Sequence, residues 1–265
     1  MKSKYALRFL ALGYLGLLLG IPVALVFINA FQDGIGAAWD AVTTPEAQHA
    51  FWLTFIMVVV AVPLNTLFGV LCALAVVRQR FRGRALLNAM VDLPFAVSPV
   101  VVGLALLLVY GRRDGWIGPW LSEHGVQIIF SMPGMILATM FVSLPFVVRE
   151  VIPVLREIGT DQEQAAATLG ANGLQTFFRV TLPAIRWGVA YGVVLTTARA
   201  LGEFGAVSVV SGKLSGGTET ATLFVENRFQ RFDETGAYAA SVVLALLAFA
   251  TLLAMNLIKP KEARG

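Results

Sequence analysis

Apolar residues occur along this chain in long uninterrupted runs and do not alternate with polar ones. A helix needs about 20 predominantly apolar residues to cross the hydrocarbon core of a bilayer. Six segments meet this requirement, and four of them contain no charged residue. The pattern predicts an all-α integral membrane protein with six transmembrane helices, at residues 9–31, 50–77, 90–110, 128–148, 187–210 and 236–258.

Composition agrees with a membrane protein. Of the 265 residues, 57% are apolar and 14% charged, and the mean hydropathy is +0.77, outside the range of ordinary soluble domains. The single cysteine, Cys72, excludes a disulfide framework, and we interpret it as a small apolar residue packed between helices. The first apolar run is longer than the hydrophobic region of a signal peptide, so we expect it to remain as a span.

Lysine and arginine are distributed unequally between the two sets of loops. Fourteen lie in the N-terminal tail, in the loops after the second and fourth spans and in the C-terminal tail. Five lie in the loops after the third and fifth spans. Because cytoplasmic loops carry the excess of positive charge, both termini are predicted to be cytoplasmic. This topology explains the pI of about 9.5 without binding to nucleic acid.

The predicted cytoplasmic loop at residues 156–186 is more polar than its surroundings. Thr160 and Glu163 have the spacing of a capping box, in which each side chain bonds to the other residue's backbone N–H. This pattern predicts a helix at residues 161–169, and Gly170 provides a left-handed stop after it.

A second cap follows in the same loop. Asn172 and Gln175 repeat the capping pattern and predict a short second helix, which Pro183 should end or bend. Two short helices hinged at a glycine are therefore expected on the cytoplasmic side. From the caps alone, a structured connector at the membrane surface explains the pattern equally well.

The spacing within this loop carries a resemblance to a known family. Gln164-Ala165-Ala166 precedes Gly170 by three residues, and nine more separate Gly170 from Val180-Thr181-Leu182-Pro183. This resembles the E-A-A-x3-G-x9-I-x-L-P signature of bacterial ABC importer permeases, with Gln for the signature Glu and Val for Ile. In that family the loop docks on a separate ATPase. The resemblance implies seven ATPase-coupling residues: Glu163, Gln164, Ala165, Ala166, Gly170, Leu182 and Pro183.

A second resemblance lies in the fifth span. Residues 198–212, ARALGEFGAVSVVSG, resemble W-type permeases of sulfate/thiosulfate importers, whose relatives carry molybdate and tungstate. The resemblance covers residues 1–265 as one domain and implies the type I ABC importer permease fold, with a cytoplasmic coupling helix, in the bacterial inner membrane. It implies four kinds of partner: an ABC ATPase dimer, a second permease of the T type, a periplasmic or extracellular sulfate-binding protein, and membrane lipid. A homodimeric permease and a molybdate or tungstate substrate remain open alternatives.

The loop after the fifth span is a candidate surface for that binding protein. It spans residues 213–235 and carries Arg228 and Arg231. A solvated loop face is the simpler explanation of its charges.

Two charges fall within the fifth predicted span. Arg199 and Glu203 have i, i+4 spacing and can pair on one helix face. Intramembrane charges mark either a structural ion pair or a transport path, and the sequence leaves both open. Glycines at 192, 202 and 205 leave room for a neighbouring helix. The candidate pathway residues are Arg199, Glu203, Thr196, Thr197, Ser208 and Ser211, although bonding of these hydroxyls to their own backbone is a common alternative.

The other polar groups give little sign of chemistry. Asp92 lies near the cytoplasmic end of the third span, where its side chain can reach water. His49 and His124 fall at or in extracytoplasmic loops, and no metal-ligand spacing occurs. No P-loop is present, so ATP and Mg²⁺ are assigned to the partner ATPase and no cofactor, metal or catalytic residue to this chain. The alternative to a transporter subunit driven by ATP is an ion-coupled secondary anion transporter that uses Asp92 or Glu203.

Overall fold

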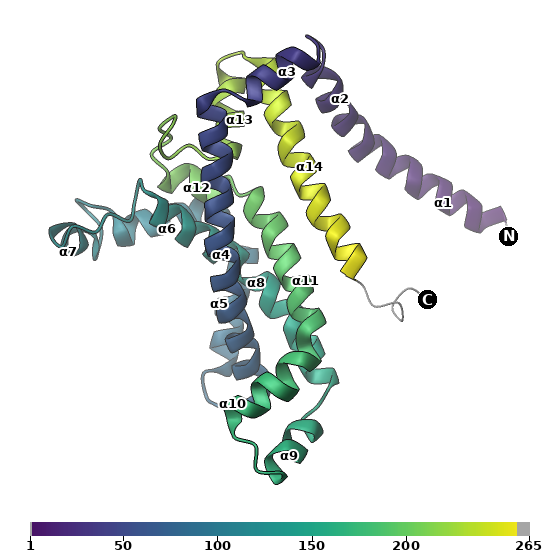
Figure 1. The fold of residues 1–265 in the computed structure, drawn as a ribbon, viewed down its shortest axis with the longest axis vertical. Coiled ribbons are helices and arrows are strands. Elements are labelled where there is room, and N and C mark those ends of the chain that lie inside the picture. Colours follow the sequence, from purple (N-terminus) through teal and green to yellow (C-terminus); the bar gives the residue numbers. More distant parts are fainter. Residues whose placement is uncertain (1, 259–265) are drawn as a thin grey trace.

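The computed structural model describes residues 2–258, so the tail that carries Lys259, Lys261 and Arg264 lies outside the described residues. Within residues 2–258 the chain is helical and contains no strand (Figure 1). The π-helices are η1 (Gly16–Gly20) and η2 (Phe177–Thr181). The α-helices are α1 (Lys2–Leu15), α2 (Ile21–Ala30), α3 (Ile35–Val42), α4 (Pro45–Arg78), α5 (Arg84–Ala96), α6 (Pro99–Tyr110), α7 (Gly118–Glu123), α8 (Met132–Glu157), α9 (Asp161–Thr168), α10 (Gly173–Thr176), α11 (Leu182–Leu201), α12 (Gly205–Val210), α13 (Ala221–Gln230) and α14 (Glu234–Ile258).

Three long helices form the core, because α4 packs along α8 and α11 packs against both. Val147 of α8 lies between two glycines of its neighbours. A Cβ at Gly69 of α4 would lie 2.7 Å from the Cβ of Val147, and a Cβ at Gly192 of α11 would lie 2.8 Å from its Cα. Such contacts between small residues let membrane helices approach closely. Buried Asn65 adds a polar contact, since its amide donates to the Ser143 hydroxyl at 2.8 Å.

The six expected transmembrane helices are only partly present as continuous helices. Four helical segments of the described chain are long and apolar enough to cross a membrane: Leu7–Ala30, Pro45–Arg78, Met132–Glu157 and Glu234–Ala254. A fifth crossing results if α5 and α6 count as one broken span. The fifth predicted span begins earlier than expected, in α11, whose 20 residues include Arg186 and Arg199 and are less apolar than the other long helices.

The third predicted span, residues 90–110, is wrong as a single straight helix. α5 and α6 meet at an angle of 116°. Val97 and Ser98 adopt extended backbone with ψ of 135° and 136°, and Pro99 follows as the first residue of α6. A proline ring disfavours helical backbone at the residue before it, which explains why the helix stops here. Pro94 lies within α5 without ending it.

The fifth predicted span, residues 187–210, is also broken. α11 ends at Leu201, and α12 begins at Gly205 after a short non-helical segment. α12 packs against α6, the other short helix that follows a break. A Cβ at Gly205 would lie 2.9 Å from the Pro99 side chain, so the predicted room beside Gly205 and Gly192 is confirmed. The same prediction is wrong for Gly202, where only its own helix lies within 4 Å.

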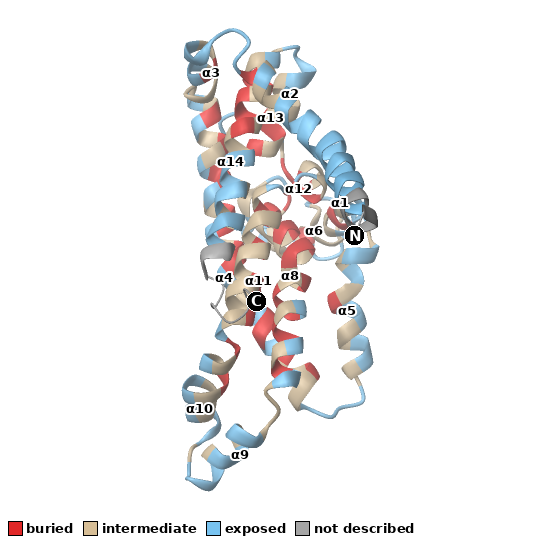
Figure 2. Cartoon of the chain, turned by 90° about the vertical axis from the view of Figure 1, so that its right-hand side faces the viewer, coloured by how far each residue is buried: buried red, intermediate tan, exposed pale blue. Residues whose placement is uncertain are grey.

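The N-terminal helices stand away from this core. Figure 2 shows α1 and α2 as mostly exposed, whereas α8 and the facing sides of α4 and α11 contain buried residues. No residue in the most apolar part of Leu7–Ala30 is buried inside the chain. Within the described residues, α2 packs against α14. The first predicted span is therefore present as a helix that leaves nearly all of its apolar surface to lipid or to another protein.

Candidate coupling and translocation sites

The loop between α8 and α11 extends beyond the helical core as two short helices, α9 and α10 (Figure 1). Gly170, two residues after the last residue of α9, has φ of +85°, so the predicted left-handed stop is confirmed. The second predicted cap is confirmed as well. Asn172 Oδ1 accepts from the N–H of Gln175 at 2.9 Å, and Gln175 Oε1 accepts from the N–H of Asn172 at 3.0 Å. These bonds fix the start of α10 without help from a partner.

The first predicted cap is wrong. The Thr160 side chain makes no capping bond, and its hydroxyl accepts instead from Gln164 Nε2 at 3.0 Å. Glu163 does not return to the backbone of Thr160, because its carboxylate is held by Arg78 at the end of α4. An ion pair with charge-assisted hydrogen bonds is stronger than a neutral cap, which explains the outcome.

Arg78 links four elements. Its guanidinium lies 3.0 Å from Glu163 Oε2, and it donates to the carbonyl oxygens of Leu155 at 3.0 Å and Gly159 at 2.6 Å. Thr181 Oγ1 donates to Glu163 Oε1 at 2.8 Å. The side chains of Arg78 and Glu163 are only 16% and 21% exposed, so solvent screens the pair incompletely. We call these residues, Arg78, Glu163 and Thr181, the latch, because they tie α9 to the ends of α4, α8 and η2.

Several predicted coupling residues are open to solvent, whereas others pack internally. Gln164, Ala165, Gly170 and Pro183 are exposed and Ala166 is half-buried. Leu182 packs against the apolar cluster at this end of the core, and Glu163 belongs to the latch. Three exposed apolar side chains that sequence reasoning missed lie on the same loop: Leu169, Leu174 and Phe178. Apolar residues in an otherwise polar loop were the sequence signal that could have identified them as contact residues.

Pro183 does not end the second helix, so that part of the expectation is wrong. α10 continues through η2 into α11, and Pro183 lies in the first turn of α11. A π-helical turn has wider i to i+5 bonding, and it allows a proline to follow without a break. The loop is therefore joined rigidly to α11.

Arg199 and Glu203 form the predicted pair, with Arg199 Nη1 2.8 Å from Glu203 Oε2. Glu203 lies beyond the end of α11, in the non-helical segment before α12. Its side chain is 1% exposed, whereas that of Arg199 is 30% exposed. Glu203 Oε1 also accepts from the N–H of Ala206 at 2.9 Å, so the carboxylate holds the start of α12.

Three of the predicted hydroxyls donate to backbone carbonyls of this chain. Thr197 donates to the Val193 carbonyl and Ser208 to the Gly205 carbonyl, each at 2.8 Å. Ser211 donates to the carbonyl of Thr218 at 2.6 Å, which closes the turn after α12. Thr197 and Ser208 follow the back-bonding alternative, whereas Ser211 bonds to a carbonyl in the following loop. Thr196 is fully buried, and its hydroxyl has no partner within the described residues.

Asp92 is paired instead of simply reaching water. It lies on α5, and Arg149 of α8 donates to it from two nitrogens, with Nε 2.8 Å from Oδ1. A bidentate pair of this kind fixes the relative orientation of the two helices. The pair joins α5, the first half of the broken span, to the core helix α8.

The opposite end of the molecule carries the loop after α12. Residues 213–235 contain α13, and two ion pairs hold them together, Lys213 with Glu226 and Arg228 with Asp233, each at 3.1 Å. Arg228 also lies over the Phe224 ring. Arg231 is exposed.

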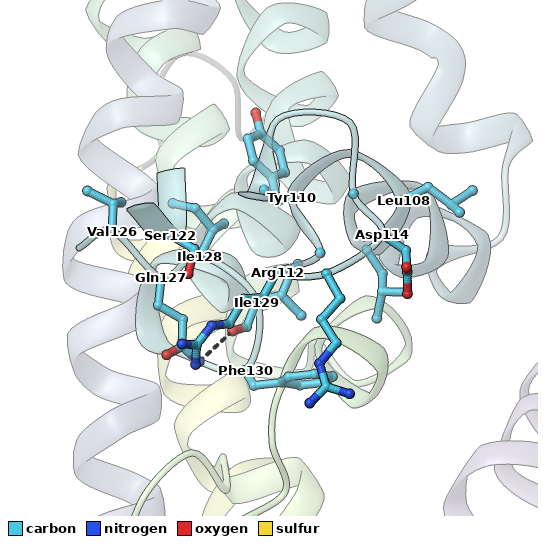
Figure 3. A pocket seen from close by; sticks show the side chains of 15 residues that line it. Leu108, Tyr110, Arg112, Asp114, Ser122, Val126, Gln127, Ile128, Ile129 and Phe130 are labelled. Carbon is cyan, nitrogen blue, oxygen red and sulfur yellow. Dashed lines mark hydrogen bonds between the residues drawn. The ribbon is translucent and has the colours of Figure 1, made fainter. Parts of the chain in front are cut away.

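A cavity of about 700 Å³ lies beside this end, between the end of α6, α7 and the segment leading to α8. Figure 3 shows its lining side chains, including Arg112, Gln127 and Phe130. Gln127 Nε2 donates to the Ile129 carbonyl at 3.0 Å, which shapes one wall. Sequence reasoning missed this cavity, because its residues come from α6, α7 and the segments beside them, none of which carries a recognisable motif.

Comparison with known proteins identifies the family. The model of the family described as binding-protein-dependent transport system inner membrane component matches residues 65–264. The chain belongs to this family. The match includes the loop with α9 and α10 as well as the broken helices that pack at α6 and α12.

Relatives within this family extend over nearly the whole chain. The sulfate transport system permease protein CysW of Synechococcus elongatus is 52% identical over 98% of this chain and 90% of its own length. The sulfate transport system permease protein CysT of the same organism is 40% identical over 95% of this chain and 90% of its own. A crystal structure of a bacterial ABC transporter involved in alginate import has the same fold, with a TM-score of 0.81 at 19% identity, covering 96% of this chain and 93% of that one.

A substitution in the latch tests whether the Arg78–Glu163 ion pair stabilises α9. Arg78→Gln removes the positive charge and leaves the Glu163 carboxylate with Thr181 alone, so we expect α9 to open more often and amide exchange there to accelerate about tenfold or more. Hydrogen–deuterium exchange of peptides that contain α9 measures this. The matched control is Arg80→Gln, which removes the same charge two residues further on at an exposed position. Equal exchange in both variants would contradict the latch.

Proposed function

We propose that this chain is the permease subunit of an ATP-driven importer of sulfate and thiosulfate. The observation that carries the proposal is the 52% identity to a CysW sulfate permease over 98% of the chain. Identity at this level over the full length is accompanied by a shared fold and membership of one transport family. The chain supplies the passage and its gating, and the chemistry of ATP hydrolysis belongs to a partner.

Six crossings of the inner membrane are part of this proposal. The broken pairs α5–α6 and α11–α12 each count as one crossing, in addition to α1–α2, α4, α8 and α14. The even number places the N-terminus and C-terminus on the same side, and the distribution of Lys and Arg favours the cytoplasm. α9 and the latch then face the cytoplasm, and α13 faces outward.

An external energy source is required if the substrate is a dianion. Moving two negative charges into a negative-inside cell costs about 4.6 kcal/mol per 100 mV of membrane potential, before any concentration gradient. We therefore assign ATP and Mg²⁺ to a dimeric ATPase that docks on the coupling loop. Ala165, Leu169 and Leu174 offer exposed small or apolar side chains for that contact, and Gln164 beside them is exposed as well.

The other partners follow from the family and from exposed surface. A T-type permease is proposed as the second half of the passage, because CysT and CysW are both relatives of this chain. The interface between the two permeases is expected to cover apolar surface that this chain leaves exposed. A soluble sulfate-binding protein is proposed to dock on the outward end, at residues 213–235, in keeping with a family described as binding-protein-dependent.

The substrate is tested by uptake. Vesicles that contain the assembled transporter and its binding protein should accumulate labelled sulfate only when ATP is supplied, and a proton ionophore should leave uptake unchanged. Unlabelled thiosulfate should compete, and molybdate should compete more weakly. Uptake that collapses with the proton gradient while ATP remains would support a secondary transporter instead.

Docking on the coupling loop is tested by Gly170→Trp. No atom lies within 4 Å of a Cβ at Gly170, so the substitution acts through its left-handed backbone, at about 1–2 kcal/mol, and through any partner that packs there. We expect at least a tenfold loss of ATPase retained in pull-down. Gly216→Trp is the matched control, since Gly216 also has positive φ and open surroundings but lies in the outward loop. Normal ATPase retention by Gly170→Trp would exclude docking at this position.

A double variant distinguishes a role of Arg199 in the transport path from a structural role in the ion pair. Arg199→Gln leaves Glu203 as a buried unpaired carboxylate, which should lower abundance as well as uptake. Adding Glu203→Gln removes the buried charge and should restore abundance. If Arg199 lines the path, sulfate uptake per molecule stays several-fold low in the double variant. Recovery of uptake together with abundance would make the pair purely structural.

A further inference from the structure

A second polar cavity lies near the latch, at the opposite end of the core from α13. It has a volume of about 450 Å³ and is lined by Arg82, Arg84 and Arg156, together with Asn88, Val76 and Phe81. The arginines come from the turn before α5, the first turn of α5 and the last turn of α8. Two separate pieces of backbone, residues 82–84 and the last turn of α8, therefore place cations around one small space.

These arginines differ from others in the chain. Arg78 and Arg149 each pair with a carboxylate of a neighbouring helix. Within residues 2–258, Arg82, Arg84 and Arg156 form no ion pair, and no acidic residue lines the cavity. Like charges gathered in this way repel one another, and the repulsion is relieved when an anion binds between them.

The surroundings favour a preformed site. Val76 is 2% exposed and belongs to the apolar cluster that joins α4, α8 and α11, so the floor of the cavity is part of the packed core. α5 packs directly on α8, which fixes the distance between Arg84 and Arg156. Asn88, one turn further along α5, adds amide donors to the guanidinium groups.

The donors define the ligand chemistry. Guanidinium groups bind phosphate and sulfate oxygens through paired N–H donors. The volume is larger than a single bare tetrahedral oxyanion needs, and the exposed Phe81 offers an apolar rim. Basic pockets between membrane helices on the cytoplasmic side are suited to lipid head groups.

We propose that Arg82, Arg84, Arg156 and Asn88 form a binding site for a tetrahedral oxyanion, separate from the translocation path. Its source is the phosphodiester of an anionic phospholipid or a free inorganic oxyanion. An occupied site would bridge α5 and α8 beside the latch, and so would stabilise the end of the core that holds the coupling loop. Binding of an anion at this site is independent of sulfate transport and of ATP hydrolysis by the assembly.

The test uses the full chain purified with the subunits that it assembles with, and it has two arms. In the first, the protein is reconstituted with phosphatidylcholine alone or with added phosphatidylglycerol, and native mass spectrometry counts retained phosphatidylglycerol. In the second, equilibrium dialysis in detergent measures binding of inorganic phosphate at constant ionic strength. Arg82→Gln and Arg156→Gln should each weaken binding about tenfold in the arm that shows it.

Arg80→Gln is the matched control, because Arg80 lies in the same turn but does not line the cavity. Binding in the first arm alone identifies a lipid site, and binding in the second identifies a site open to free anions. Failure of both arms in the unaltered protein overturns the proposal. Equal weakening by Arg80→Gln and Arg82→Gln also overturns it, because diffuse attraction to a basic loop would then be sufficient.

Discussion

Helices inside a bilayer associate without the hydrophobic driving force that assembles soluble cores, so this structure depends on how closely α4, α8 and α11 can approach. The contact is made where Val147 occupies the space left by Gly69 and Gly192. A methyl group at either glycine would separate the helices along their length. The apolar clusters on both sides of this contact, the latch below it and the α12 contact above it all require the three axes to stay at this spacing.

Irregular backbone is the second constraint, since hydrogen-bonding groups freed inside a membrane need a partner in the protein. The chain meets this need with side chains placed at the ends of helices. Arg78 donates to a carbonyl in the last turn of α8 and to one just after it, and Glu203 accepts from an N–H at the start of α12. The same side chains are members of ion pairs, so each of them both satisfies backbone and joins two elements. Helix breaks and charges thus occur together for one physical reason.

The positions of the spans and the two-helix loop could be predicted from sequence, because an apolar run of about 20 residues and a cap such as Asn172 with Gln175 act locally. The breaks could not. Pro94 is tolerated within α5 whereas Pro99 follows a sharp bend, so the presence of a proline does not by itself locate a break. Glu163 had the right spacing for a cap, but its actual partner, Arg78, is 85 positions away, and no local pattern reports such a pairing.

The length of α8 has a mechanical consequence. One end of this 26-residue helix is held by the latch, and the other lies against α12, where Met135 and Ala138 share a cluster with Val207. A helix of this length measures about 39 Å, so a tilt of about 5° at the latch displaces the far end by about 3 Å. Because α4 and α11 pack along its length, α8 can act as a lever arm when these helices tilt together with it. A small tilt at the end of α8 beside α9 therefore produces a displacement of about 3 Å at the end beside α6 and α12.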